Sequence, residues 1–337
     1  MSQMNRTRPA PAKDQGARNQ GTRDQGFVLV NALVLVAALA AVATLLLSRA
    51  EQGRSRLEAG LLADQLSLSL DGFDALALSQ LARDSGSSDH LREAWAKPRP
   101  PLALARGDVV GQIQDLQGRF NVNWLSQADS PLAQEAFVLL LARLGLPPRI
   151  ADDIRRFVTP GAELADRQRW LQRDPPLDPV GGPLLSADQL ADLPGLSPRA
   201  YARLRPLITA LPGDSRLNVN TARPEVLASF LPDLSSAVLA RLLRQRDRQG
   251  FASVEDFLTA ARLQQAEDTP QEPPASSPEG DSPPDRVGPE QISVSSQWFR
   301  VDSQARLDGR MASRVSLLHR RSAGRRPDLI WQVTSRP

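Results

Sequence analysis

The 337-residue sequence predicts an α+β fold, in which a long N-terminal helix and an antiparallel sheet accompany a large all-helical domain. Three observations lead to this class. An apolar helical segment occupies 27–47, apolar and polar residues alternate at 107–127 and again at 291–335, and helical patterning fills 128–265 between them. We therefore expect the helical domain to be inserted between two groups of strands that share one sheet.

The segment 27–47 predicts a transmembrane helix. Among its 21 residues only Asn31 and Thr44 are polar. A helix of this length spans roughly 30 Å, the thickness of a bilayer core. At 48–83 apolar residues recur at steps near three and four, which predicts an amphipathic continuation of the same helix. Its apolar stripe comprises Leu57, Leu61, Leu62, Leu66, Leu70, Phe73, Ala77 and Leu81.

The leader at 1–26 carries the charge imbalance of the sequence. Its net charge is +3, equal to that of the whole sequence, and it arises from Arg6, Arg8, Lys13, Arg18 and Arg23 against Asp14 and Asp24. A positive leader favours a cytoplasmic N-terminus, with everything after Leu47 outside the inner membrane. Since the remaining sequence is close to neutral, the basic composition is poor evidence for nucleic-acid binding.

Two other interpretations of the N-terminus remain open. Ala41-Val42-Ala43 has the small-x-small pattern of a secretory cleavage site, although the apolar core is longer than that of a usual signal peptide. An uncut signal anchor is the second interpretation. Neither explains the Gly26-Phe27 junction or the amphipathic stripe that follows.

The first strand segment, 107–127, predicts two short antiparallel strands. Ile113 alternates with glutamines, and a second alternation follows the predicted turn at Gln117-Gly118. The apolar members of that second alternation are Phe120, Val122 and Trp124.

The helical domain at 128–265 shows repeated helix boundaries. Ser130 and Pro131 predict the start of a helix that Gly145 ends. Further caps are expected at Ser186, Ser197, Ser235 and Ser253, and a proline-rich loop at 175–183 divides the domain into two predicted lobes.

A linker is predicted at 266–290, followed by the closing strands at 291–335. The linker holds seven prolines and few apolar residues. Its acidic residues show no spacing typical of a calcium loop. In the closing segment, period-two alternation starts at Ile292, Asp308-Gly309 predicts a hairpin turn, and Leu329, Trp331 and Val333 predict a last strand.

The N-terminus resembles those of type IV prepilins and pseudopilins. In that family a membrane peptidase cuts after a glycine, here Gly26, and Phe27 becomes the N-terminus and a site of N-methylation. Most members have glutamate at the fifth mature position, whereas Asn31 stands there in this sequence. That departure resembles one branch, the minor pseudopilin K of type II secretion (the GspK family).

Other segments resemble the same branch. They are 111–123 and 296–310, which resemble its sheet segments, and 190–197 and 218–222, which resemble helix-hairpin-helix elements. The resemblance implies a pilin-like fold with a large all-α insertion of helix-hairpin-helix or SAM-like modules.

For function, the resemblance implies a single-pass inner-membrane protein at the tip of a periplasmic pseudopilus. The pseudopilus is needed to export folded proteins across the outer membrane. Implied partners are the minor pseudopilins I, J and H, the major pseudopilin, the prepilin peptidase and membrane lipid. Calcium is a candidate ligand by resemblance alone, with no assigned metal residues.

A membrane-anchored DNA-binding protein is the alternative function. Helix-hairpin-helix units bind phosphates through a glycine-rich hairpin, but the second hairpin, 232–235, lacks glycine and carries Asp233. Between 186 and 265 ten arginines face eight acidic residues, a weak positive excess. We therefore expect no nucleic-acid binding. No nucleophile with a matched base, metal spacing or phosphate loop indicates an enzyme.

Overall fold

The computed structural model describes residues 21–127, 130–159, 168, 170–172, 174, 176–268, 287–288 and 290–335. Most of the predicted leader and linker, including the linker acids Glu272, Glu279, Asp281 and Asp285, lies outside the described residues. The protein divides into two compact units, 1–65 and 66–337, which are described separately.

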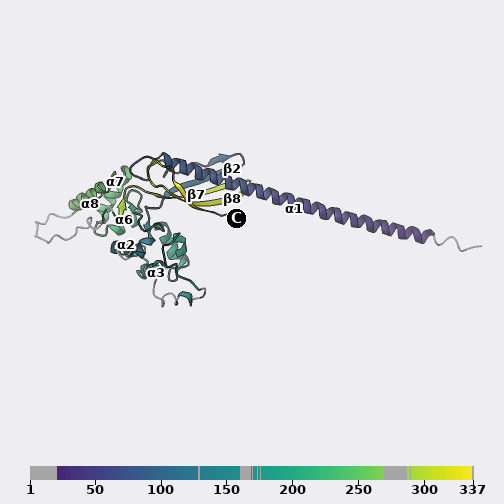
Figure 1. Ribbon diagram of the computed structural model, residues 1–337, viewed down its shortest axis with the longest axis horizontal. Coiled ribbons are helices and arrows are strands. Elements are labelled where there is room, and N and C mark those ends of the chain that lie inside the picture. Colours follow the sequence, from purple (N-terminus) through teal and green to yellow (C-terminus); the bar gives the residue numbers. More distant parts are fainter. Residues whose placement is uncertain are drawn as a thin grey trace, which may run out of the picture. The chain divides into compact units, whose positions relative to one another are not determined.

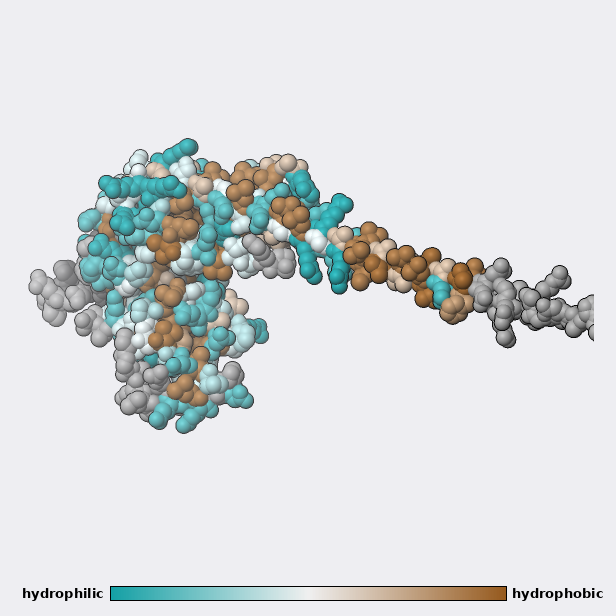
Figure 2. Space-filling view, turned by 45° about the vertical axis from the view of Figure 1, so that its right-hand side comes forward, coloured by the Kyte–Doolittle hydropathy of each residue, from teal (hydrophilic) through white to brown (hydrophobic). Residues whose placement is uncertain are grey.

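A single helix, α1 (Gly21–Arg83), begins the described part of the protein (Figure 1). From Phe27 onward it is the one helix among the described residues that is long and apolar enough to cross a membrane. Figure 2 shows its apolar N-terminal part followed by a hydrophilic band. In the first unit, Leu57 and Leu61 of the predicted stripe are exposed, so nothing within that unit covers them.

In the second unit, the rest of α1 packs against a five-stranded antiparallel sheet (Figure 1). The buried apolar residues of α1 are Leu66, Leu70, Phe73, Ala77 and Leu81, all from the predicted stripe, and Leu78, which the predicted stripe did not include. The order along the sheet is β1-β2-β7-β8-β9. The strands are β1 (Leu102–Leu104), β2 (Gly107–Asp115), β7 (Trp298–Leu307), β8 (Arg310–His319) and β9 (Asp328–Ser335).

The pairing of β2 with β7 joins segments that are far apart in sequence. Its register runs from Gly107 opposite Leu307 to Asp115 opposite Phe299. The β7–β8 hairpin turns at Asp308 and Gly309, which have φ angles of 48° and 76°, as the turn signal predicted.

Two strand predictions were wrong. No hairpin forms at Gln117-Gly118: β3 (Phe120–Asn121) instead pairs in parallel with β4 (Ile208–Thr209), and Val122–Ser126 forms the 3-10 helix η1. The alternation misled because Asn121 and Asn123 are buried too, with their amides bonded to the carbonyl of Leu211. Burial on both sides imitates the pattern of a half-exposed strand.

Ile292 was also assigned to the wrong sheet. It lies in β6 (Ile292–Ser293), which pairs in parallel with β5 (Leu217–Asn218) rather than with the closing strands. This two-stranded sheet attaches the segment before β7 to the helical block, because β5 belongs to that block.

The helical block follows β3 and ends before β6. Ser197, Ser235 and Ser253 accept backbone N–H bonds at helix starts, Ser186 forms a capping box, and Ser130 makes no side-chain cap bond. Gly145, with φ of 60°, follows the first helix. The helices are α2 (Pro131–Arg143), α3 (Arg149–Val158), η2 (Ala187–Leu190), α5 (Pro198–Leu204), η3 (Arg205–Leu207), α6 (Pro224–Phe230), α7 (Ser236–Arg248) and α8 (Val254–Asp268).

Candidate functional site: a buried polar junction

The residues of the predicted processing site lie in the first unit. Gly26 and Phe27 are both inside α1, which begins five residues before Gly26 at Gly21. Phe27 and Asn31 lie four positions apart, so they share one face of the helix, and both are exposed. They are therefore available for contact with lipid, a peptidase or a neighbouring subunit.

In the second unit, polar side chains gather where β2 ends and the helical block begins. We call this cluster the buried polar junction; it consists of Asp89, Asp115, Asn218, Thr221, Ser296 and Arg320, all buried. None of the predicted site residues belongs to it. Its members come from the segment after α1, from β2, from β5 and the turn after it, from the residues just before β7 and from the residue just after β8.

Asp115 is the acceptor at the centre of the junction. Its Oδ1 accepts the Gln117 backbone N–H at 2.7 Å, and its Oδ2 accepts from Ser296 Oγ at 2.6 Å and from Thr221 Oγ1. The Asn218 amide adds a fourth donor at 3.2 Å. Burying a carboxylate is costly unless donors surround it, so Asp115 requires the segments that supply these donors to be in place together.

Asn218 extends the junction to the segment after α1. Its Nδ2 donates to the Asp89 carbonyl at 3.1 Å and to Ser296 Oγ at 2.8 Å. The Asp89 carboxylate in turn accepts the Ser296 backbone N–H at 2.7 Å. The helical block is thus tied both to the sheet and to the segment that leaves α1.

Arg320 closes the junction beyond the end of β8. Its Nη1 donates to Asp84 at 2.7 Å, and its Nη2 donates to the Ser296 carbonyl at 3.0 Å and to the Asp89 carboxylate. The guanidinium also lies over the Phe299 ring, 4.9 Å from its centroid. One buried cation therefore holds the C-terminal end of α1, the following segment and β7 together.

Burial sets the protonation behaviour of the two junction acids. Burial raises the pKa of Asp89 to about 7, although the positive charge of Arg320 acts in the opposite direction. Burial also raises the pKa of Asp115, against the hydrogen bonds from Ser296 and Thr221 that favour its charged form.

A second buried ion pair joins α1 to the sheet. Arg314 of β8 contacts the carboxylates of Asp71 and Asp74, and Ser316 Oγ donates to Asp74 at 2.9 Å. Arg314 and Asp74 are both buried, and each provides the opposite charge that the other needs when it is removed from water. This pair fixes the rotation of α1 on the sheet.

One group of acids has the spacing of a metal site. The carboxylates of Asp84, Asp89 and Glu93 lie within 4.8 Å of one another. Arg320 already donates to Asp84 and Asp89, and Trp95 Nε1 donates to Glu93. Two of the three carboxylates already bind the Arg320 guanidinium and the third accepts a bond from Trp95, so these residues do not fit the calcium ion that the family resemblance implied.

Sequence reasoning missed the junction because its members are scattered. Asp115 lies within the predicted strand segment 107–127, just before the predicted turn, and Asn218 belongs to the segment 218–222 that resembles a helix-hairpin-helix element. The available signal was a carboxylate at a position that the alternation assigns to the buried face.

Comparison with known proteins identifies the family. Two family models, both described as type II secretion system protein K, match residues 118–213 and 217–276. The type II secretion system protein K of Pseudomonas aeruginosa is 31% identical over 249 residues, which cover 70% of this chain and 68% of that protein. That of Pectobacterium carotovorum is 26% identical over 322 residues, covering 88% of this chain and 93% of the relative.

The fold has a solved counterpart. One protein in the crystal structure of the GspK-GspI-GspJ complex of enterotoxigenic Escherichia coli superposes with a TM-score of 0.69 and 23% identity, covering 84% of this chain and all of that one. This similarity shows the fold, and the Pseudomonas aeruginosa relative and the two family models show that the protein belongs to the type II secretion system protein K family, the minor pseudopilin K of that system.

Proposed function

We propose that this protein is the tip subunit of the type II secretion pseudopilus, needed for its assembly and for export of folded proteins across the outer membrane. The observation that carries the proposal is the position of the helical block. The backbone leaves the sheet at Asp115 and returns at Trp298, next to Arg320, which binds the C-terminal end of α1. The block therefore extends from the end of the sheet where α1 stops.

This position supports a tip role because pseudopilins stack through their N-terminal helices. A block at the far end of α1 occupies the space that the next subunit would need. A subunit that bears it has room for neighbours below and none above.

Asn31 supports the same role. In the family, a glutamate at this position pairs with the N-terminal amine of the neighbouring subunit, and an unpaired buried charge would be costly. Asn31 has no charge to pair. A subunit without a neighbour above it does not need a negative charge at this position.

Processing at the N-terminus is part of the proposal. We infer that the prepilin peptidase cleaves between Gly26 and Phe27 on the cytoplasmic side, and that the bulk of the protein is periplasmic. Peptide mass spectrometry of the protein purified from membranes, with and without the peptidase, tests this inference. We expect the protein to start at Phe27 only when it is made in cells that contain the peptidase. An uncleaved leader both with and without the peptidase would contradict the inference.

The expected partners follow from the family. The similar E. coli protein was solved in a complex named GspK-GspI-GspJ. We propose that this protein likewise binds minor pseudopilins I and J, and we extend the proposal to H, the major pseudopilin and membrane lipid. Co-expression of the full-length protein with I and J tests it: a stable ternary complex in detergent is expected, and recovery of the protein by itself would contradict it.

The helical block is proposed to consist of helix-hairpin-helix or SAM-like modules. The pair α6 and α7, joined at 231–235, is the best candidate for such a module. Asp233 is exposed in that connection, where a phosphate would approach in a DNA-binding module. We therefore assign the modules to protein contacts.

We propose the division predicted from the sequence for the leader 1–26, the transmembrane helix 27–47, its amphipathic continuation 48–83, the helical insertion 128–265 and the linker 266–290. The two sheet segments, predicted at 107–127 and 291–335, are narrower than predicted, because the first contributes β2 (Gly107–Asp115) to the five-stranded sheet and the second contributes its strands from Trp298 onward.

A further inference from the structure

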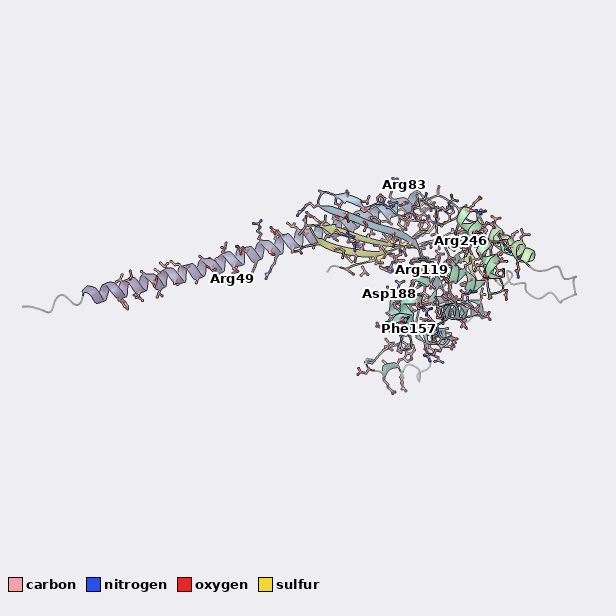
Figure 3. The ribbon with its side chains drawn as sticks, turned by 180° about the vertical axis from the view of Figure 1, so that it is seen from behind. Arg49, Arg83, Arg119, Phe157, Asp188 and Arg246 are labelled. Carbon is pink, nitrogen blue, oxygen red and sulfur yellow. The ribbon has the colours of Figure 1, made fainter. Side chains whose placement is uncertain are left out.

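A cavity of about 300 Å³ lies beside the buried polar junction, between the sheet and the helical block. Its lining is mixed and includes the apolar side chains of Trp95 and Ile113. The lining also includes three arginines, Arg119, Arg223 and Arg246. Figure 3 labels Arg119 and Arg246, which come from the turn after β2 and from α7.

A close backbone contact brings the arginines together. At Gly118 a Cβ atom would lie 2.5 Å from the Thr221 carbonyl oxygen, so only glycine permits this approach. The Arg223 backbone N–H donates to the Gly118 carbonyl at 3.0 Å. Arg246 Nη1 donates to the carbonyl of Ala222 at 2.7 Å. These backbone contacts bring Arg119 and Arg223 to the cavity, together with Arg246, which also pairs with Asp247 at 3.2 Å.

Arg119 is a buried cation without a carboxylate partner among the described residues. Its side chain donates to the Gln114 side-chain oxygen, and the residue is only 9% exposed. Other arginines near it are paired: Arg205 with Asp188, and Arg300 with Asp302. A guanidinium that is mostly buried, bonded to one neutral amide and facing a cavity has further N–H donors that an anion would satisfy.

The electrostatics of the cavity favour an anion. Burial lowers the pKa of Arg119 to about 10; the charges of Arg205, Arg300 and Arg223 act in the same direction, and that of Asp302 acts in the opposite direction. Asp115 also lines the cavity, but its two oxygens accept bonds from the junction donors. Arg223 is exposed at the cavity and makes no ion pair with a described carboxylate, so two guanidinium groups can bind one ligand.

We propose that this cavity binds a carboxylate attached to a short apolar group, as found at the C-terminus or on a glutamate residue of a polypeptide partner. The planar fork of an arginine matches a carboxylate with two parallel hydrogen bonds. The side chains of Trp95 and Ile113 would contact the apolar group of the ligand, whereas a hydrated inorganic anion would lose hydrogen bonds there.

Calorimetric titration of the full-length protein in detergent micelles tests the proposal with three probes. N-acetyl-leucine carries a C-terminal carboxylate, N-acetylglutamic acid α-methylamide keeps only the side-chain acid of glutamate, and inorganic phosphate is the bare anion. Binding of at least one carboxylate probe, tighter than that of phosphate, is expected, and the tighter of the two identifies the source. No binding of either probe, or phosphate binding as tight as theirs, would overturn the proposal.

Variants locate the site. Arg119→Met should weaken carboxylate binding about tenfold, the value of one charge-assisted hydrogen bond. Arg223→Met removes an exposed guanidinium and should weaken binding in the same direction without unfolding the protein. Arg203→Met, at an exposed position of α5, is the matched control and should leave binding unchanged. Equal affinities in the Arg223→Met and Arg203→Met proteins would place the ligand elsewhere.

Discussion

Asp115 shows how one residue sets the arrangement of distant segments. Its carboxylate lies at the end of β2, and its donors belong to the turn that follows, to the segment after β5 and to the residues before β7. Each donor satisfies part of the cost of burying the acid. The helical block can therefore attach to the sheet in few other ways without leaving a buried charge unbonded.

Replacing Asp115 by alanine should destabilise the second unit. The change leaves the Ser296 and Thr221 hydroxyls without their acceptor, and we expect the free energy of unfolding to fall by about 2–4 kcal/mol. Denaturant unfolding of the full-length protein in detergent measures the change. Asp233→Ala, at an exposed carboxylate, is the control, and equal losses in the two variants would refute the role of Asp115.

Asp89 should make the stability of the second unit depend on pH. Burial raises the pKa of Asp89 from 3.8 to about 7, so the folded protein holds a proton that the unfolded protein releases. The contribution of this group to stability is therefore fully present below about pH 4 and is lost as the pH rises through about 7. Melting temperatures between pH 5 and pH 8 measure the decline.

The Asp89→Asn protein provides the comparison. Asparagine does not titrate, so the decline should be shallower than in the unmodified protein. A remaining slope is expected from Asp74, Glu93 and Asp115, because burial raises the pKa of each. Identical slopes for the two proteins would contradict the assignment to Asp89.

At the scale of elements, the contact between α1 and β2 depends on a glycine. A Cβ atom on Gly111 would lie 2.5 Å from the Phe73 ring and 2.7 Å from the Asp302 carbonyl oxygen. Gly111→Ala should therefore lower the free energy of unfolding by about 1–3 kcal/mol through overpacking. Unfolding of the detergent-solubilised protein provides the measurement.

Gly72 provides a matched control in the same part of the molecule. It lies in α1 next to Phe73, and nothing lies within 4 Å of a Cβ atom there. Gly72→Ala should be neutral or stabilise the protein by up to about 1 kcal/mol, because alanine favours the helix. A loss of stability in this variant equal to that of Gly111→Ala would contradict the packing argument.

The elements that sequence predicted well are those with one buried face. The stripe from Leu66 to Leu81 and the strands on either side of Asp308-Gly309 follow simple periods, and the structure has them at those positions. Val122 was misassigned because its neighbours Asn121 and Asn123 are buried as well. Ile292 does alternate with less buried neighbours, but its period gives no information on its pairing partner, which is Leu217 of β5. The junction was missed because the period of a segment gives no information on which distant donors meet Asp115.

At the scale of the whole molecule, the sequence combines a membrane helix with an inserted helical block. The strands β2 and β7, which flank the insertion in sequence, pair with each other in the sheet. Arg320 donates a hydrogen bond to Asp84, directly after α1, at the end of the sheet from which the helical block extends. We propose that such a block fits only on a subunit on which no further subunit stacks. The tip position is therefore the central proposal.

Asn31→Glu tests the charge part of that claim. A glutamate here would place a carboxylate in the membrane segment without an amine to pair with, and we expect less of the complex with minor pseudopilins I and J and reduced secretion. Asn31→Gln keeps the amide and is the control. Normal complex and secretion levels in Asn31→Glu would remove the charge argument and leave the steric one.

Labelling the subunit on isolated pseudopili tests the tip position most directly. The sequence has no cysteine, so Asp233→Cys creates a single reactive site at an exposed position. After reaction with maleimide-gold, electron microscopy of pseudopili should show gold at one end of each labelled filament. Gold distributed along the shafts would contradict the tip assignment.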